Sequence, residues 1–575
     1  MKNAKIVNVF SGEVHKADVA IADGIFVGFE EEEEAAYNTK NLYDAQGRYM
    51  CPGLIDGHIH IESTFLSPQE FCNAVASHGT SAVICDPHEI ANVLGLSGID
   101  YLIQSSLGLP VKIYFMMPSC VPAIYMETSG AVILDKDIHE YMNRYPELVL
   151  GLAEMMNYPG VTHEDKEVLS KLVAASSRPK DGHAPLLLGK SLNAYIIAGL
   201  GSDHECTNVK EAIEKLRKGM HIMIRQGTHE KNLHDLIPII NNFNSFHISL
   251  VSDDRDPIDL KENGHMDYLV RTAISLGIPP VRAIQMVSIN TARYFGLKNI
   301  GAIAPGFKAD FILLDDLESF WISEVFYEVK KIDRPSINTA RSQGYRVFGD
   351  SNNSLKSLLQ NTMHIKSLDD PNMFMIPTSH NVKSSVSGLN VIGVIPGQII
   401  TQKRIIPAKI DEKLGVVADG KRDVAKLAVV ERHHGTGNIG LGFVQGLGLE
   451  RGDIASSVAH DSHNVVVAGM NDIDMLSAVR YVSYIGGGLA VVENGLITAG
   501  LPLPIAGLMS DRPIESVVSN LTAVNQASLK LGSNVIKDPF MLLSFLSLPV
   551  IPSLKLTDRG LVDVDKFHFS SLWAD

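Results

Sequence analysis

The stretch Gly53-Leu54-Ile55-Asp56-Gly57-His58-Ile59-His60 is an apolar, strand-like run that ends in two histidines two positions apart. Successive side chains of a strand point to opposite faces, so His58 and His60 face the same side. Two imidazoles on one side of a strand end can bind one metal ion. The run therefore predicts a hydrolytic metal site at the end of a buried strand.

Seven more apolar runs follow, separated by segments of helical length, an alternation typical of a parallel α/β fold. The eight predicted strands end at Ile55–His58, Ala82–Asp86, Lys112–Met116, Leu148–Leu152, Asp181–His183, Leu200–His204, His221–Arg225 and His247–Asp253. Eight such units suffice to close a (β/α)8 barrel of the TIM type. We therefore predict an α/β fold with this barrel over residues 51–299.

Residue types that bind metals recur at the ends of these predicted strands. They are His58, His60, Asp86, His88, Glu89, Glu154, His183, His204 and Asp253. In a TIM-type barrel the loops after the strands build the active site. One such histidine alone is more often structural, but a purely structural barrel has no reason to collect the whole series in one mouth. The series therefore predicts a metal centre.

Short β-runs flank the predicted barrel on both sides. We expect residues 1–50 and 300–348, including Asp310–Leu314 and Tyr345–Phe348, to form one small β-domain. The tract over 349–391 begins with polar, helix-poor sequence and is interpreted as a linker. Residues 392–575 have the length of a separate C-terminal α/β domain.

Composition excludes some classes of partner. The 575 residues include 50 Lys and Arg against 65 Asp and Glu, a net charge of −15, which counts against a nucleic-acid surface. No window holds eighteen uncharged apolar residues, so we expect no membrane partner. Five scattered cysteines without a CxxC pair suit a reducing compartment. We expect a cytoplasmic enzyme that forms a homo-oligomer.

Several motifs together resemble a known family. The dyad within Pro52–His60, with the closing run Gly301–Asp310, resembles the amidohydrolase superfamily. More narrowly, four stretches resemble the bacterial adenine deaminases: Asp86–Val93, Pro118–Ala123, Asp181–Pro185 and Ser202–Thr207. The resemblance spans nearly the whole chain. It implies metal-dependent hydrolysis of adenine, the small-molecule substrate, to hypoxanthine and ammonia in purine salvage.

The resemblance also implies a binuclear divalent metal centre, with ligands His58, His60, Glu154, His183, His204 and Asp253. The first histidine pair would bind one ion, the second pair the other, and Glu154 would bridge them. Many relatives have a carboxylated lysine on the fourth strand, where this chain has Glu154. The family likeness favours Mn²⁺ or Fe²⁺, and Zn²⁺ also suits these ligands.

Three of these residues would have catalytic roles as well. Glu154 would protonate N1 of the purine, and Asp253 would pass a proton to the leaving amino group. His204 would orient the nucleophile or act as a ligand only. For Asp86, His88 and Glu89 two roles stay open: hydrogen bonding to the edge of the base, or support of the metal ligands.

Two groups of residues are given no catalytic role. Arg225 is interpreted as structural, in a segment where the family usually has glutamate at the position of Gln226. The C-terminal histidines are favoured as loop-capping or domain-interface residues, although a contribution to the purine pocket stays open. They are His433, His434, His460 and His463.

Two other functions compete with adenine deamination. The first is another amidohydrolase activity, such as hydrolysis of a cyclic amide or of guanine. Guanine-type deaminases carry HxxE at the fifth strand, whereas this chain has His183-Ala184-Pro185-Leu186. The second is a non-catalytic subunit with a decayed site. Decay should remove ligands, and all the expected positions are filled, which favours an enzyme.

Overall fold

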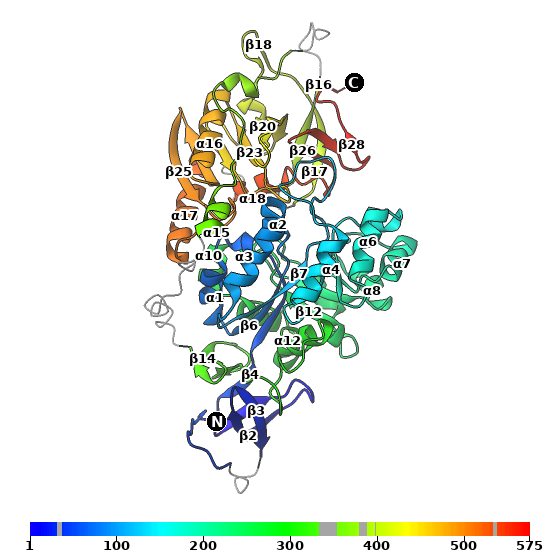
Figure 1. Ribbon diagram of the computed structural model, residues 1–575, viewed down its shortest axis with the longest axis vertical. Coiled ribbons are helices and arrows are strands. Elements are labelled where there is room, and N and C mark those ends of the chain that lie inside the picture. Colours follow the sequence, from blue (N-terminus) through cyan, green and yellow to red (C-terminus); the bar gives the residue numbers. More distant parts are fainter. Residues whose placement is uncertain (32–36, 333–352, 379–387, 397, 533–537, 575) are drawn as a thin grey trace.

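The computed structural model describes residues 1–31, 37–332, 353–378, 388–396, 398–532 and 538–574. Three regions follow one another along the long axis of the molecule (Figure 1). The N-terminal strands lie at one end, the parallel strands with their helices in the middle, and the C-terminal region at the other end.

The middle region contains eight parallel strands in two sheets of order β5-β6-β7-β8-β9 and β10-β11-β12. Their bounds are β5 Leu54–Ile59, β6 Thr80–Cys85, β7 Lys112–Met117, β8 Val149–Met155, β9 Lys180–Gly182, β10 Ser202–Asp203, β11 His221–Arg225 and β12 Ile248–Val251. All eight predicted strands are therefore confirmed, within a few residues at their ends.

The two parallel sheets meet at both of their edges. The Gly201 N–H donates to the Lys180 carbonyl at 2.9 Å, which joins the ends of β9 and β10. At the other edge Ile59 and Asp253 form a parallel bridge, which joins β5 and β12. Because the strands are parallel and follow chain order, their carboxyl ends lie at one common edge.

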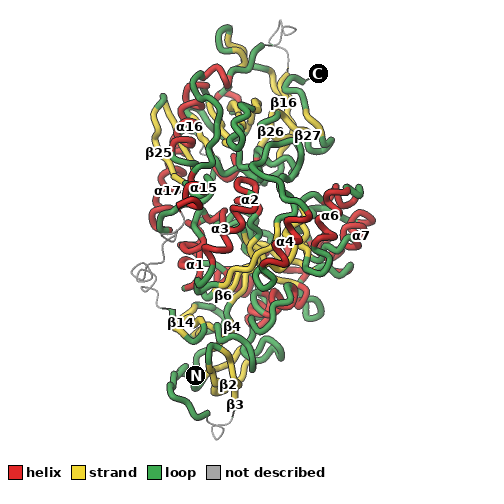
Figure 2. The backbone as a smooth tube through the Cα atoms, viewed as in Figure 1, coloured by secondary structure: helices red, strands yellow, loops and turns green. Residues whose placement is uncertain are grey.

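Thirteen helices of this region lie between the parallel strands or directly after the last of them in the sequence, and the helices pack around the strands (Figure 2). They are α1 Pro68–Ala76, α2 His88–Leu94, α3 Leu96–Ser106, α4 Asp135–Arg144, α5 Tyr158–Thr162, α6 Lys166–Ala174, α7 Gly189–Ile197, α8 Val209–Arg217, α9 Leu233–Leu236, α10 Pro257–Asn263, α11 Met266–Ser275, α12 Pro280–Met286 and α13 Ile289–Tyr294. Helix α1 shows how they form: the Ser67 side chain caps its first turn, Pro68 begins it, and Phe71 and Val75 are buried.

A seven-stranded sheet of order β15-β14-β13-β4-β1-β2-β3 occupies the N-terminal end. Its strands are β1 Ala4–Val7, β2 Val14–Ala22, β3 Ile25–Glu30, β4 Tyr49–Pro52, β13 Phe311–Leu314, β14 Ile322–Tyr327 and β15 Lys330–Lys331. Strand β13 pairs antiparallel with β4, so the chain returns to this sheet after the parallel strands. Tyr345–Phe348, also expected to return, lies outside the described residues.

The C-terminal region is built on an eight-stranded sheet of order β17-β16-β21-β20-β23-β22-β24-β25. The strands are β16 Gly388–Val394, β17 Thr401–Pro407, β20 Val424–Val430, β21 Ile439–Gln445, β22 Asp453–Ser456, β23 Val465–Gly469, β24 Gly488–Glu493 and β25 Leu496–Pro502. Its helices are α16 Asp472–Tyr484, α17 Ile514–Lys530 and α18 Pro539–Phe545. Smaller strands are β18 Ile410–Asp411, β19 Gly415–Val416, β26 Leu554–Thr557, β27 Gly560–Asp563 and β28 His568–Phe569.

The tract expected to be a helix-poor linker contains helix α15, Asn353–Gln360, and the short 3₁₀ helix Pro371–Phe374. The expectation of a helix-poor segment was therefore wrong. The reason is burial: Leu359 of α15 and Phe374 are both fully buried, so apolar contacts hold these turns against the rest of the protein. Residues 349–352 and 379–387 of the expected linker lie outside the described ranges.

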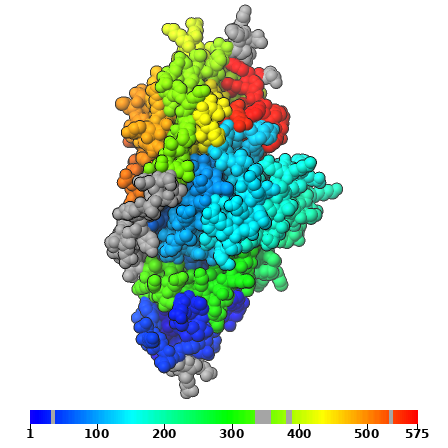
Figure 3. Space-filling view, viewed as in Figure 1, coloured from blue at the N-terminus to red at the C-terminus, as the bar shows by residue number. Residues whose placement is uncertain are grey.

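One apolar core continues from the middle region into the C-terminal region. Leu66, Leu503 and Leu543 are all fully buried in the same cluster of contacting side chains. The space-filling view shows the C-terminal atoms lying directly on those of the middle region (Figure 3).

All five cysteines are buried free thiols. Among the described helices, none has the length and apolar character needed to cross a bilayer.

Candidate metal centre

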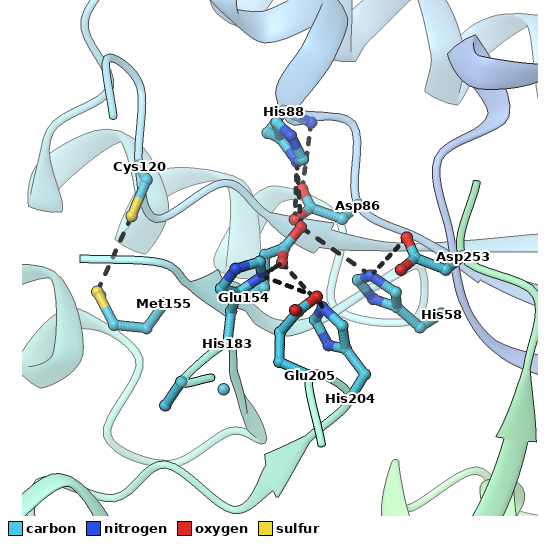
Figure 4. Close-up of polar contacts among 12 residues, drawn as sticks. His58, Asp86, His88, Cys120, Glu154, Met155, His183, His204, Glu205 and Asp253 are labelled. Carbon is cyan, nitrogen blue, oxygen red and sulfur yellow. Dashed lines mark hydrogen bonds and ion pairs between the residues drawn. The ribbon is translucent and has the colours of Figure 1, made fainter. Parts of the chain in front are cut away.

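Six side chains predicted as metal ligands converge at the carboxyl ends of the parallel strands. His58 and Glu154 lie in β5 and β8, and His60, His183, His204 and Asp253 lie in the residues directly after β5, β9, β10 and β12. Figure 4 shows Glu154 lying among the imidazoles of His58, His183 and His204. The strand ends thus bring together residues nearly two hundred positions apart in the chain.

The Glu154 carboxylate lies between two pairs of histidines. Its Oε1 atom is 3.4 Å from His60 Nε2 and 4.0 Å from His58 Nε2. Its Oε2 atom is 2.5 Å from His183 Nδ1 and 3.1 Å from His204 Nε2. Each oxygen therefore faces a different pair, and the carboxylate links the two halves of the cluster.

Asp253 faces the first histidine pair from the opposite side. Its Oδ1 atom is 3.3 Å from His60 Nε2 and 3.8 Å from His58 Nε2. Its Oδ2 atom accepts a hydrogen bond from Arg225 Nη1 at 3.0 Å. The backbone of Asp253 is left-handed, with φ +58°, a conformation that costs energy outside glycine and that tends to cluster at functional sites.

Hydrogen bonds fix which imidazole nitrogens face the carboxylates. His60 Nδ1–H donates to the Asp86 carbonyl at 3.1 Å, so Nε2 carries the free lone pair toward Glu154 and Asp253. His58 Nε2 is buried without a hydrogen-bond partner among the described residues. Its lone pair is therefore available to a ligand at the centre of the cluster.

The charges in the cluster stabilise one another. Burial favours a neutral Glu154, but His183 and His204 hold the pKa of that carboxyl well below its usual range. In the same way burial opposes protonation of His204, while Glu154 raises the pKa of this imidazole to about 9. The site is therefore strongly polarised, with anionic carboxylates surrounded by buried imidazoles.

The donor atoms suit a divalent metal ion. Sets including His58, His60 and Asp253, or His58, Glu154 and His204, place one ligand atom each within 4.8 Å of one another. Ligands bound about 2.1 Å from a shared ion lie about 3–4 Å apart, as do most of the distances above. Imidazole nitrogens with carboxylate oxygens are a donor set that divalent transition metals accept.

Asp86, His88 and Glu89 lie beside this cluster but differ in what they contact. His88 Nδ1 is 3.1 Å from Asp86 Oδ2 and 3.6 Å from Glu154 Oε1. Glu89 turns toward the C-terminal region, where its oxygens contact His463 Nε2 and, at 2.6 Å, His460 Nδ1. His88 and Asp86 therefore adjoin the ligands, whereas Glu89 joins two regions of the molecule.

The C-terminal histidines make contacts within their own region and across to the middle region. His433 Nε2 donates to the Ser462 carbonyl at 2.7 Å, and His434 Nε2 to the Ser129 carbonyl at 3.0 Å. His460, beyond its contact with Glu89, lines the cavity above the cluster. The C-terminal histidines thus include residues at the interface between the two regions and one residue, His460, that lines the cavity.

A cavity of about 430 Å³ opens over the cluster. Its polar lining includes Glu154, His183, His204 and Asp253, together with Glu230 from the loop after β11. Most of its apolar lining comes from the C-terminal region, namely Ile399, Phe545, Leu548 and Ile551, and Met156 of the middle region adds to it. The volume is within the range of small-molecule sites, so one wall of a small-ligand site comes from each region.

Sequence reasoning gave no site role to five polar residues of this cavity: Glu205, Arg225, Glu230, Asp254 and Asp461. Arg225, interpreted as structural, pairs with Glu205, with Nη2 3.2 Å from Oε2, and also holds Asp253. The signals were present, since Glu205 directly follows His204 and Arg225 ends a predicted strand. Glu230 lies five residues beyond its strand, in a loop whose course the sequence does not reveal.

Comparison with known proteins gives matches along the whole chain. The amidohydrolase family matches residues 49–341, and the adenine deaminase C-terminal domain matches residues 398–568. The chain is 53% identical to the adenine deaminase of Oleidesulfovibrio alaskensis, an alignment that covers 100% of this chain and 96% of that protein. It is 48% identical to the adenine deaminase of Desulfatibacillum aliphaticivorans, with the same coverage. The chain therefore belongs to the adenine deaminase family of the amidohydrolase superfamily.

Proposed function

We propose that this protein is a metal-dependent adenine deaminase, which converts adenine and water to hypoxanthine and ammonia in purine salvage. The observation that carries the proposal is the position of Glu154, each oxygen of which faces a different histidine pair. Membership of the adenine deaminase family, over nearly full length, supports the choice of substrate.

We infer that the eight parallel strands close into a (β/α)8 barrel over residues 51–299. The bridge between β5 and β12 and the contact between β9 and β10 support closure.

The flanking segments 1–50 and 300–348 would form the small β-domain, 349–391 the connection, and 392–575 the C-terminal domain. The pairing of β13 with β4 supports the first of these assignments.

Two divalent ions would be held by the six converging side chains. His58 and His60 would bind one ion, His183 and His204 the other, with Glu154 bridging and Asp253 completing the set. The spacing of the donor atoms and the unpartnered His58 Nε2 support this assignment. When bound, such ions lower the pKa of water and so make hydroxide available at neutral pH. Mn²⁺ or Fe²⁺ is favoured by the family likeness, and Zn²⁺ fits the same donors.

The chain's own carboxylates would move the protons that deamination requires. Addition of water to C6 of adenine places electrons on N1, and the Glu154 carboxylate would take a proton from the attacking water and deliver it there. Asp253 would take the remaining proton of the added hydroxyl and pass it to the amino group, which then leaves as ammonia. Arg225 would hold Asp253 in position through its bond to Oδ2, and His204 would orient the nucleophile.

The residues after β6 would support this chemistry from one side. His88 lines the cavity and adjoins Glu154, so we assign it a contact with the base edge. Asp86 would orient His60 and His88, since its carbonyl accepts from one and its carboxylate adjoins the other. Glu89 would fix the C-terminal region over the cavity.

We further expect a cytoplasmic homo-oligomer that needs neither nucleic acid nor a membrane.

The proposal is tested by substrate choice. The purified protein, loaded with Mn²⁺, is incubated separately with adenine, adenosine, guanine and a cyclic amide such as dihydrouracil, and ammonia and ring products are measured. We expect one ammonia and one hypoxanthine for each adenine consumed. Preferential hydrolysis of guanine or of the cyclic amide would contradict the proposed function and indicate a different amidohydrolase activity. Inertness toward all four would favour a non-catalytic subunit.

A further inference from the structure

Glu230 is a cavity-lining carboxyl that the proposed chemistry does not use. It lies in the loop after β11, at the same end of the strands as His204 and Asp253, and lines the cavity with them. The residue is half-buried as a whole, but both carboxyl oxygens are buried. Neither oxygen has a hydrogen-bond partner in the part of the chain that the structure describes.

A buried carboxyl without a partner is costly, because it has lost its water without gaining a bond. The loop itself is ordered by backbone bonds, with Gly227 N–H donating to the Glu230 carbonyl at 3.1 Å. The side chain is therefore held at the cavity with two unused hydrogen-bonding positions. This is the arrangement expected of a group that binds a ligand in the cavity.

The chemistry of a carboxyl defines what it can bind. Its two coplanar oxygens match a pair of neighbouring ring nitrogens of which one carries a proton. In adenine, N9–H and N3 flank C4 and form such a pair. With C6 and N1 directed at Glu154, the N3–N9 edge is the opposite edge of the purine and remains free. In a nucleoside N9 carries the sugar and has no proton to donate.

We propose that Glu230 binds the N3–N9 edge of adenine and so selects the free base over N9-substituted purines. The proposal rests on the function proposed above and assigns substrate recognition to a residue outside the metal cluster. The apolar wall from Ile399, Phe545, Leu548 and Ile551 would cover the faces of the ring, and Glu230 would fix its rotation in the plane.

The electrostatic surroundings favour a carboxyl that both donates and accepts. Burial, followed by the charges of Asp254 and Asp253, raises the pKa of Glu230 to about 7, against the opposing charges of Arg225 and His229. Near neutral pH a large fraction of the side chains is therefore protonated. In that form the O–H donates to N3 while the carbonyl oxygen accepts from N9–H.

The test compares Glu230→Leu and Glu230→Gln with the wild type, using adenine and 9-methyladenine. Lys231→Leu, at the exposed neighbouring position, is the matched control. We expect Glu230→Leu to raise KM for adenine about tenfold to a hundredfold, the effect of losing paired hydrogen bonds, with kcat changed far less. Glu230→Gln should stay within about threefold of wild type, because an amide also offers one donor and one acceptor.

The substrate comparison isolates the edge that is bound. The wild type should prefer adenine to 9-methyladenine in kcat/KM, and Glu230→Leu should lose most of that preference. Unchanged KM and preference in Glu230→Leu would overturn the assignment, as would an equal loss in Glu230→Gln. A fall in metal content or in kcat alone would also overturn it, since it would indicate a role at the metal centre. If the wild type itself releases no ammonia from adenine, the proposed function fails first and this inference falls with it.

Discussion

Glu154 is the residue on which the site depends, because it contacts both histidine pairs. Glu154 lies near the end of strand β8, where its carboxylate is buried and an isolated charge would be costly. The imidazoles of His183 and His204 offset that cost and keep its pKa well below the usual range. Glutamine at this position would retain the shape of the side chain but lose the negative charge that faces both histidine pairs.

Glu154→Gln tests the role of this charge. We expect metal bound per chain to fall and ammonia release from adenine to drop at least about a hundredfold, because both a ligand charge and a proton donor are lost. Glu147→Gln, an exposed change just before the same strand, should leave both quantities unchanged. Metal is measured by elemental analysis and turnover by ammonia yield. Near-normal turnover in Glu154→Gln would show that another group protonates the purine.

At the scale of single elements, α2 and the segment after β22 are joined through Glu89. His463 Nδ1 accepts the Ala459 N–H at 3.1 Å, so its proton is on Nε2, which faces Glu89. His460 Nδ1 contacts the other Glu89 oxygen at 2.6 Å. Both hydrogen bonds to this buried carboxylate of the middle region thus come from the C-terminal region, while His88 Nε2 of the middle region lies 3.5 Å from Oε1.

His463→Leu should therefore destabilise the protein. It leaves one oxygen of a buried carboxylate without its donor, which we expect to lower the free energy of unfolding by about 1–3 kcal/mol. His434→Leu removes an exposed histidine that also contacts the middle region, and should change stability by less than about 0.5 kcal/mol. Urea unfolding followed by circular dichroism measures both. Equal effects of the two substitutions would refute the role given to Glu89.

Lys555, in β26, holds the apolar wall of the cavity. Its buried Nζ donates to the carbonyls of Phe545 at 2.8 Å and Ile399 at 3.0 Å. Burial lowers the pKa of this amine to about 7. Between that value and the unfolded pKa of about 10.4, the unfolded chain binds a proton that the folded chain does not. The contribution of Lys555 to stability therefore rises with pH across this window.

Lys555→Met removes this titration. We expect the wild type to gain stability relative to the variant as the pH rises from 7 to 9.5, by at most about 1.4 kcal/mol per pH unit. The measurement is the difference in urea unfolding free energy between the two proteins at each pH. A difference that stays constant with pH would mean that the amine is already charged in the folded protein.

For the whole molecule, the sequence predicted the parts that depend on local pattern. Strand ends such as those of β5 and β8 are marked by apolar runs, so His58, His60 and Glu154 could be placed at one edge of the parallel strands. The apolar wall of the cavity could not be predicted, because Ile399 and Phe545 reach it only through the packing of the C-terminal region. Helix α15 was missed because its sequence is rich in polar residues, and the burial of Leu359 depends on contacts with distant parts of the chain.

The central claim is that two divalent ions, held by ligands from five separate strands, make this protein an adenine deaminase. The most direct measurement is a titration of metal-free protein with Mn²⁺, in which bound metal and ammonia release from adenine are followed together. We predict that activity rises until two ions are bound per chain and then stays constant. Full activity at one ion per chain, or none in the fully loaded protein, would contradict the account.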